Sequence, residues 1–456
     1  MRKLFIFDLD GVLLDSGDLH FTAFAKALEE STGIILSKHV HDVEYNGLPT
    51  RIKLQKLGIN DDLVHTIATR KQDLTHQAFL DVIQSTRLRG MVNGLHERGY
   101  KVMCASNCVR SAVDLVLSRL GIRDILDAVF SNEDVSSPKP APDLYLRAME
   151  DAGVGPGETI IFEDSYVGLQ AAIASGATVH RVDNPSVLTL QYVLEARPNL
   201  TNHVNIVIPM AGNGSRFATA GYKDPKPFIP VFGEPMISWV VRNLGVNAKY
   251  TFIIRKDFEE TYSAHKYLDS IAPGCSIVTV DSLTEGATCT VLLAKEHVDN
   301  DSPLVIINSD QYIEFENCDT ASKLIFDFLY NPKEVGLDGK ISTFDGGGHP
   351  KWSYAKVGDD DIVSEVREKD PFSPHATTGL YMWRKGSDFV KYANQMIAKN
   401  IRVNNEFYVV PVFNEAIVDG KKFTICPCSR MWGIGVPEDL EYFVNHFNDR
   451  FMDSNI

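Results

Sequence analysis

Short apolar runs that read as strands alternate along the chain with longer amphipathic stretches that read as helices, and this alternation constrains the fold more than any other feature. The strand-like runs are rich in Val, Ile and Phe and include residues 3–7, 101–105, 159–162, 205–209, 250–255, 276–280 and 304–308. Alternation of this kind is typical of α/β folds with parallel strands. Two of the runs, within 1–10 and 204–215, lead at once into a loop rich in Asp or Gly, so the pattern predicts that an α/β domain begins twice.

The boundary between the two domains is expected in a polar segment that follows the last strand-like run of the first half, 177–182. At 456 residues the chain is long enough for two domains with cores of their own. Between the first two strands of the first half, a long stretch without a strand pattern predicts an inserted helical cap. The predicted divisions are a first domain over 1–196 (core 1–16 and 86–196, helical cap 17–85), a linker over 197–203 and a second domain over 204–456.

Composition narrows the range of partners. The chain carries 60 Asp and Glu against 45 Lys and Arg, a formal charge of −15, which argues against a nucleic acid partner. No apolar stretch approaches the ~20 residues of a membrane span, and no signal peptide pattern is present. The seven Cys lack metal-site spacing and indicate thiols in a reducing cytoplasm. We therefore expect a cytoplasmic protein with small-molecule substrates and no membrane contact, and the sequence leaves a homo-oligomer open.

Two carboxylates, Asp8 and Asp10, follow the first strand, at the edge where open parallel sheets place their ligands. Their repulsion would be offset by a divalent cation, and a carboxylate beside Mg²⁺ can attack phosphorus while its neighbour moves the leaving-group proton. A polar turn after a strand is the alternative. Later residues favour the phosphate site, because they supply a hydroxyl, an ammonium and two more carboxylates: Ser106, Lys139, Glu163 and Asp164.

In this order and spacing, these residues resemble the four motifs of the haloacid dehalogenase superfamily of phosphotransferases, over roughly residues 1–185. The resemblance implies a Rossmann-like core with Asp8 as nucleophile and Asp10 as general acid/base. It also implies phosphate contacts from Ser106, Asn107 and Lys139. The Mg²⁺ ligands that it implies are Asp8, Asp10, Glu163 and Asp164.

The insertion resembles the helical cap of the subgroup that contains phosphoglycolate phosphatase and beta-phosphoglucomutase, in which the cap selects the substrate. The cap-side candidates are Asp18, His20 and the segment 46–51, with Arg51 as a second anion contact or, alternatively, part of a solvated helix face. Phosphatases and mutases share all four motifs, and we favour a phosphatase because phosphatases are commoner.

A second constellation follows the strand-like run 205–209. Its loop consists of Ala211, Gly212, Asn213, Gly214 and Ser215. Small residues let backbone N–H groups approach a triphosphate, and Arg216 can neutralise charge as pyrophosphate leaves. Lys226 follows ten residues later in a proline-bounded loop, so a pair of cations is available for a polyphosphate.

These residues resemble the nucleotidyltransferases that make sugar nucleotides, which have a GT-A-like α/β fold, over about 204–445. The resemblance implies that an acceptor phosphate attacks the α-phosphorus of a nucleoside triphosphate while Asp310 holds Mg²⁺. The other residues that the resemblance assigns are Glu285, Gly286 and Ala287 for the base, Glu368 and Lys369 for the sugar phosphate, and Thr378 and Gly379 for the acceptor.

The chain departs from this family at Gly433, where a second metal-binding aspartate is usual. Either Asp310, phosphates and water hold the metal, or another acid such as Glu406 or Asp439 contributes. The segment 352–356 is closer to cytidylyltransferases linked to capsule synthesis, which favours CTP over other nucleotides.

The sequence therefore predicts a bifunctional enzyme: a phosphatase followed by a nucleotidyltransferase that joins a sugar or polyol phosphate to a nucleotide, for capsule or other surface polysaccharide synthesis. Alternatives are a sugar-phosphate mutase as the first domain, or one domain that only binds or regulates. The acceptor, the nucleotide and the order of the two reactions stay open.

Overall fold

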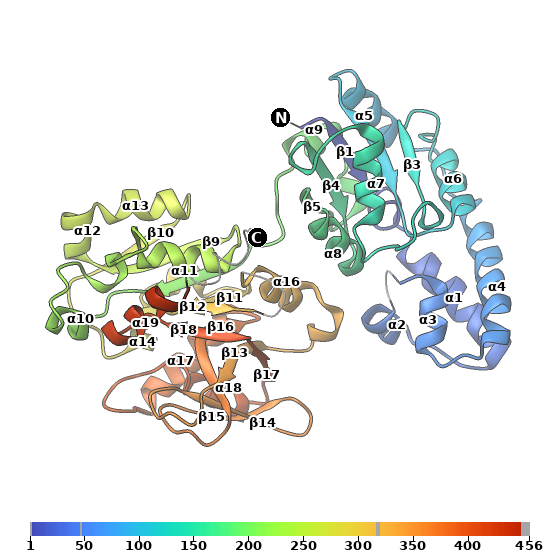
Figure 1. The fold of residues 1–456 in the computed structure, drawn as a ribbon. Helices are drawn as coiled ribbons and strands as arrows, with labels where there is room; N and C mark the ends of the chain where they lie inside the picture. Colours follow the sequence, from blue (N-terminus) through green and yellow to red (C-terminus); the bar gives the residue numbers. More distant parts are fainter. Residues whose placement is uncertain (1, 46–47, 316–319, 448–456) are drawn as a thin grey trace. The chain divides into compact units, whose positions relative to one another are not determined.

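Two α/β units, residues 1–200 and 201–456, make up the chain in the computed structural model, which describes residues 2–45, 48–315 and 320–447 (Figure 1). The division between the units lies inside the segment 197–203, where the sequence is polar. Within the described residues, no helix combines the length and the apolar character needed to cross a membrane.

A five-stranded parallel sheet forms the centre of the first unit, in the order β3-β2-β1-β4-β5. The strands are β1 (Leu4–Phe7), β2 (Lys101–Ala105), β3 (Ala128–Phe130), β4 (Thr159–Glu163) and β5 (Thr178–Arg181). β1 is buried along its whole length, as expected for a central strand covered on both faces. The helices around the sheet are α5 (Thr86–His96), α6 (Arg110–Arg119), α7 (Asp143–Ala152), α8 (Tyr166–Ala174) and α9 (Leu190–Glu195).

Four helices lie between β1 and α5 and form the cap: α1 (Gly17–Thr32), α2 (Lys38–Glu44), α3 (Thr50–Lys56) and α4 (Asp61–Phe79). They pack around a small core of their own that includes Phe24, Leu54 and Ile67. Ser37 caps α2 and Asn60 caps α4 by accepting hydrogen bonds from backbone N–H groups. The described part of 17–85, which leaves out residues 46 and 47 of the predicted cap-side segment, contains helices and no strand, which confirms the predicted helical insertion.

A nine-stranded mixed sheet forms the centre of the second unit. Its main path is β10-β9-β6-β11-β16-β13-β17, and β14 joins β15 to β16. β10, β9, β6 and β11 are parallel, whereas β16 runs antiparallel to β11, β13 and β14. The strands are β6 (Asn205–Pro209), β9 (Lys249–Arg255), β10 (Ser276–Val280), β11 (Leu304–Ile307), β13 (Gly339–Asp345), β14 (Tyr354–Val357), β15 (Val363–Arg367), β16 (His375–Trp383) and β17 (Phe423–Pro427).

Two strand pairs and a set of helices complete the second unit. The pairs are β7 (Pro230–Val231) with β8 (Glu234–Pro235), and β12 (Gln311–Glu314) with β18 (Arg430–Gly433). The helices are α10 (Ser215–Thr219), α11 (Met236–Leu244), α12 (Lys256–Tyr262), α13 (Ala264–Ile271), α14 (Ala287–Leu292), α15 (Lys295–Val298), α16 (Ser322–Tyr330), α17 (Gly386–Ala398), α18 (Val412–Val418) and α19 (Pro437–Phe447).

Successive side chains of a strand point to opposite faces of the sheet, so alternate residues in the second unit pack into two different hydrophobic cores. Val207 and Ile253 belong to one core, whereas Ile206 and Phe252 belong to the other. Trp383 is buried in the first of these cores together with Phe389, so the aromatic residues of this region pack the interior, as their apolar surroundings in the sequence suggest.

Candidate active sites

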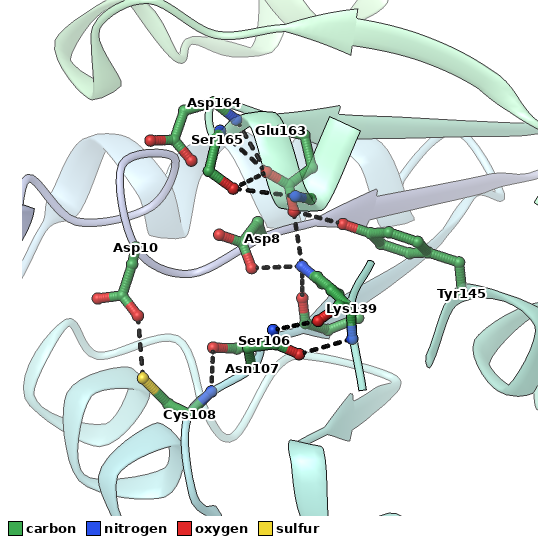
Figure 2. Close-up of polar contacts among 12 residues, drawn as sticks. Asp8, Asp10, Ser106, Asn107, Cys108, Lys139, Tyr145, Glu163, Asp164 and Ser165 are labelled. Carbon is green, nitrogen blue, oxygen red and sulfur yellow. Dashed lines mark hydrogen bonds and ion pairs between the residues drawn. The ribbon is translucent and has the colours of Figure 1, made fainter. Parts of the chain in front are cut away.

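In the first unit, neighbouring strand ends bring the predicted phosphate-site residues together (Figure 2). Phe7 of β1 pairs with Cys104 of β2 and with Phe162 of β4. Because these parallel strands are in register, the residues that follow them lie side by side at one edge of the sheet. Asp8 therefore lies close to Ser106 and to Glu163, which is the last residue of β4.

Lys139 joins this group from the loop before α7. Its Nζ donates to Asp8 Oδ1 at 2.7 Å, to Glu163 Oε1 at 2.6 Å and to the Ala105 carbonyl oxygen at 2.9 Å. Asn107 holds the loop, because its side chain donates to the Lys139 carbonyl oxygen and accepts from the Lys139 N–H. Burial lowers the pKa of Lys139, but the charges of Asp8 and Glu163 outweigh it and raise the pKa overall, so the ammonium stays charged.

The carboxylates around Lys139 fit a divalent cation. One oxygen from each of Asp8, Glu163 and Asp164 lies within 4.8 Å of the others. Asp164 Oδ1 is buried and has no hydrogen-bond partner among the residues that the structure describes. Burial, followed by the charge of Glu163, raises the pKa of Asp8 to about 8, and burial also raises the pKa of Asp164. The cluster holds three carboxylates, two of them bonded to the one ammonium, so it has the oxygen donors and the excess negative charge that Mg²⁺ requires.

Gly11 makes room for this cluster. Its φ of +77° lies in the left-handed region, and a Cβ at this position would overlap the Asp164 carboxylate. Glycine is therefore required both by the turn after β1 and by the close approach of Asp164.

The carboxylate of Asp10 belongs to a different group. Its Oδ1 accepts from Ser16 Oγ and lies 2.8 Å from His20 Nε2. Its Oδ2 accepts from Cys108 Sγ at 3.0 Å (Figure 2). Burial raises the pKa of Asp10, but the charge of His20 and the three hydrogen bonds outweigh it and hold the pKa well below its usual value. Sequence analysis grouped Asp10 with the Mg²⁺ ligands, whereas the structure places its side chain with His20 and Cys108.

A cavity of about 640 Å³ connects this edge of the sheet with the cap. Asp8, Asp10 and Ser106 line it, together with the predicted cap residue Arg51, which is exposed. Sequence reasoning missed several residues that touch the cavity or the charged cluster: His41, Lys53, Lys71, Cys108 and Tyr145, whose hydroxyl donates to Glu163 at 2.7 Å. None of them belongs to a local motif, and only the packing of the helices reveals them.

In the second unit, the Gly-rich loop, Lys226 and Asp310 meet beyond the ends of β6 and β11. Lys226 Nζ donates to Asp310 Oδ2 at 2.5 Å. Gly214 precedes α10 with φ of +57°, and a Cβ on it would lie 3.1 Å from Lys226 Cβ, so the loop packs directly on this lysine. Arg216 lies on α10 and is exposed. Asp310 also lies against Gly435, where a Cβ would overlap its carboxylate.

The residues predicted to bind the base and the sugar phosphate contact one segment, 402–408, in which the sequence shows no motif. Phe407 N–H donates to the Glu285 carbonyl oxygen at 2.8 Å, and Thr288 N–H donates to the Phe407 carbonyl oxygen at 3.0 Å. This pairing holds Gly286 and Ala287 in place. Lys369 Nζ donates to Tyr408 Oη at 2.5 Å, next along the same segment.

The remaining predicted residues of the second unit are Glu368, just after β15, and Thr378 and Gly379 on β16. Glu368 accepts from Ser353 Oγ, and burial raises its pKa. The Gly379 carbonyl oxygen accepts from Asn308 N–H at 3.1 Å, two residues before Asp310.

Two further side chains bear on the second site. Arg255, at the end of β9, donates to Asn213 Oδ1 at 2.9 Å; sequence reasoning missed it, although a cation at the end of a predicted strand could have indicated it. Asp439, one of the two acids considered in place of an aspartate at Gly433, lies beside that glycine, because a Cβ on Gly433 would be 3.2 Å from Asp439 Oδ2. Lys351 Nζ lies 3.2 Å from the same oxygen.

Comparisons with known proteins match each of the two units to a family. The family model of haloacid dehalogenase-like hydrolases matches residues 5–182, and that of nucleotidyl transferases matches residues 206–427. The fructose-1-phosphate phosphatase YqaB of Escherichia coli K12 is 33% identical over 175 residues, which are 38% of this chain and 91% of the relative. A phosphorylated carbohydrates phosphatase of Thermotoga maritima is 28% identical over 177 residues, 38% of this chain and 80% of the relative.

A solved structure of a nucleoside-diphosphate-sugar pyrophosphorylase from Vibrio cholerae RC9 is 25% identical, with a TM-score of 0.44, and the match covers 53% of this chain and 100% of that chain. By the two family models and the curated relatives, the chain is an enzyme with a phosphatase unit and a nucleotidyltransferase unit. The chain belongs to the haloacid dehalogenase-like hydrolases through its first unit, and its second unit is a nucleotidyl transferase domain. The predicted families and the α/β fold class are confirmed.

Proposed function

We propose that the first unit hydrolyses a sugar or polyol phosphate through an aspartyl phosphate on Asp8. The observation that carries this proposal is the convergence of Asp8, Ser106, Lys139 and the Glu163–Asp164 pair at one cavity. The names of the two relatives, which mention fructose 1-phosphate and phosphorylated carbohydrates, support this class of substrate.

In the proposed reaction, a carboxylate oxygen of Asp8 forms a bond to phosphorus while the bond to the leaving oxygen breaks. Asp10 is ionised at rest, so the proton for the leaving oxygen comes from the hydrogen bond between His20 Nε2 and Asp10 Oδ1. Asp10 passes this proton to the leaving oxygen, and the Asp10–His20 pair regains one from the water that hydrolyses the aspartyl phosphate. Lys139 and Ser106 hold the phosphoryl oxygens. Asp8, Glu163 and Asp164 would hold Mg²⁺, which when bound neutralises the negative charge of the phosphoryl group.

Phosphate release by the full chain tests this proposal. Asp8→Asn should abolish release of inorganic phosphate from hexose phosphates, whereas the matched control Asp151→Asn, an exposed carboxylate on α7, should leave it unchanged. Release that survives Asp8→Asn would refute the assignment. Interconversion of hexose phosphates without release of phosphate would identify a mutase in place of a phosphatase.

We propose that the second unit joins a sugar or polyol phosphate to a nucleotide, with CTP favoured. An oxygen of the acceptor phosphate forms a bond to the α-phosphorus of the triphosphate, and the bond to the departing pyrophosphate breaks. The loop 211–215 binds the triphosphate through backbone N–H groups, and Arg216 and Lys226 neutralise its charge.

The contact between Lys226 and Asp310 supports this assignment, because the lysine proposed to bind the triphosphate lies against the carboxylate proposed to bind the metal. Asp310 would hold Mg²⁺, and the position of Asp439 beside Gly433 supports it as the second carboxylate. From the family resemblance, we propose that the product supplies surface polysaccharide synthesis.

Pyrophosphate release tests the second activity. The Asp8→Asn chain, which cannot consume the acceptor, would be incubated with CTP, UTP, dTTP, GTP or ATP and a panel of sugar and polyol phosphates. Release should occur with CTP and should fall at least ~100-fold in a chain that also carries Asp310→Asn, the scale expected when a charge-stabilising group is removed. Asp301→Asn, an exposed change in the same unit, is the control. Unchanged release in the Asp310→Asn chain would refute the metal assignment.

A further inference from the structure

The cap places a buried lysine, Lys53, on the wall of the cavity that contains Asp8. Only 8% of Lys53 is exposed, and its Nζ lies 3.0 Å from His41 Nε2 and 5.4 Å from the centre of the Phe24 ring. Among the residues that the structure describes, no carboxylate lies within ion-pairing distance of this ammonium. A buried ammonium that lacks a negative partner is costly, so its retention on a cavity wall calls for an explanation.

His41 positions Lys53 through this contact but, being neutral, does not offset the positive charge of the ammonium. Burial, with the charge of Lys53 next, lowers the pKa of His41 to about 4, so the imidazole is neutral near pH 7. His41 Nδ1 lies 3.3 Å from Asp42 Oδ1. A neutral ring with its proton on Nδ1 can donate to Asp42 and accept from Lys53 at Nε2, and we assign this tautomer from the two contacts.

Lys71 adds a second cation to the same cavity. It comes from α4, and its Nζ lies 3.2 Å from His20 Nδ1. Burial, followed by the charge of Lys71, lowers the pKa of Lys53 to about 7, while Cys108, Asp10 and Asp42 act in the opposite direction. The cap side of the cavity therefore has cationic groups in excess, whereas the sheet side has carboxylates in excess. An anion bound near Lys53 would supply the missing negative charge.

We propose that Lys53, positioned by His41, binds a second anionic group of the substrate, a phosphate or a carboxylate, in addition to the phosphoryl group that Asp8 accepts. This inference rests on the proposed phosphatase function and narrows its substrate to a sugar or polyol that carries two anionic groups. If the substrate is a bisphosphate, hydrolysis leaves a monophosphate, the class of acceptor proposed for the second unit. The reaction of the first unit would then precede that of the second.

Calorimetric binding by the full chain carrying Asp8→Asn tests the proposal, because this chain binds substrate without turning it over. The probes are glucose 1,6-bisphosphate, 6-phosphogluconate and glucose 6-phosphate, each with Mg²⁺. Adding Lys53→Met should weaken binding of at least one doubly anionic probe tenfold or more, equivalent to about 1.4 kcal/mol, and should affect glucose 6-phosphate less than threefold. Lys53→Arg, which keeps the charge, should restore part of the affinity, and Lys56→Met, an exposed change on the same helix, is the matched control.

Each outcome decides the proposal. An effect confined to the bisphosphate assigns the second group as a phosphate, and an effect confined to 6-phosphogluconate assigns it as a carboxylate. Equal weakening of all three probes, no weakening of any, or no binding by the Asp8→Asn chain would overturn the inference. Thermal melting of each variant checks that it folds. If binding depends on Lys53 but the unmodified chain releases no phosphate from any probe, the anion site stands and the phosphatase function fails.

Discussion

The buried ammonium of Lys139 is predicted to be a main source of stability for the first unit. Lys139 is 3% exposed and Glu163 is fully buried, and Asp8 is nearly so. Lys139→Met removes three hydrogen bonds and leaves two buried carboxylates without their cation. Breaking a buried ion pair by removing one partner costs about 3–5 kcal/mol. For a domain of this size each kcal/mol lowers the melting temperature by about 2–4 °C, so a fall of about 6–20 °C is expected.

Differential scanning calorimetry of the full chain in EDTA measures this effect. Lys3→Met is the matched control, because Lys3 forms an ion pair with Glu158 at 2.9 Å in the same unit but on its surface, and this change should leave the melting temperature nearly unaltered. Adding Glu163→Gln to Lys139→Met should cost less than the sum of the single changes, since the two groups interact directly. A Lys139→Met chain that melts within a few degrees of the Lys3→Met chain would refute the reasoning.

Three further predictions concern the metal, the second site and the cap. EDTA should stop both activities, and excess Mg²⁺ should restore them. A free Mg²⁺ concentration of a hundred times the Kd for Mg²⁺ should also raise the free energy of unfolding by about 2.7 kcal/mol. Full activity in EDTA would contradict the metal assignments. Gly435→Ala should reduce pyrophosphate release far more than Gly433→Ala, because only at Gly435 would a Cβ overlap Asp310; equal effects in a steady-state assay would count against this placement. The pKa of Lys53 is lowered to about 7 in the folded chain and is ~10.4 in the unfolded chain, so the unfolded chain binds more protons between these two pH values. The free energy of unfolding of the unmodified chain should therefore rise from pH 7 to 9.5 relative to that of the Lys53→Met chain, by up to about 1.4 kcal/mol per pH unit. Urea titrations of both chains at the two pH values measure this difference, and its absence would show that Lys53 titrates normally.

The sequence predicted the sheet-side residues of the first site because their positions depend only on strand ends. Asp8, Ser106 and Glu163 each lie at the end of an apolar run, and parallel neighbours bring such ends together. Their order along the chain, with Lys139 between the last two, matched a family pattern, so the family could be predicted as well.

The cap side could not be predicted in this way. Lys53 is buried and Arg51 is exposed, although they are two residues apart on the same short helix. Both line the cavity, and which of them is buried depends on how α3 packs against α4. The local sequence pattern does not determine that packing. The orientation of Asp10 was missed for the same reason, because Ser16, His20 and Cys108 determine it.

The pairing of β1 has a consequence for how the first unit can change over time. Leu4 pairs with Lys101 on one side and with Thr159 on the other, so the cap is a loop between two adjacent strands. The entropy lost on closing such a loop grows only with the logarithm of its length, about 0.6 kcal/mol for each doubling. Lengthening, shortening or exchanging the helices between these strands therefore costs the sheet little. The cap can therefore change during evolution while Asp8, the proposed nucleophile, stays where β1 ends.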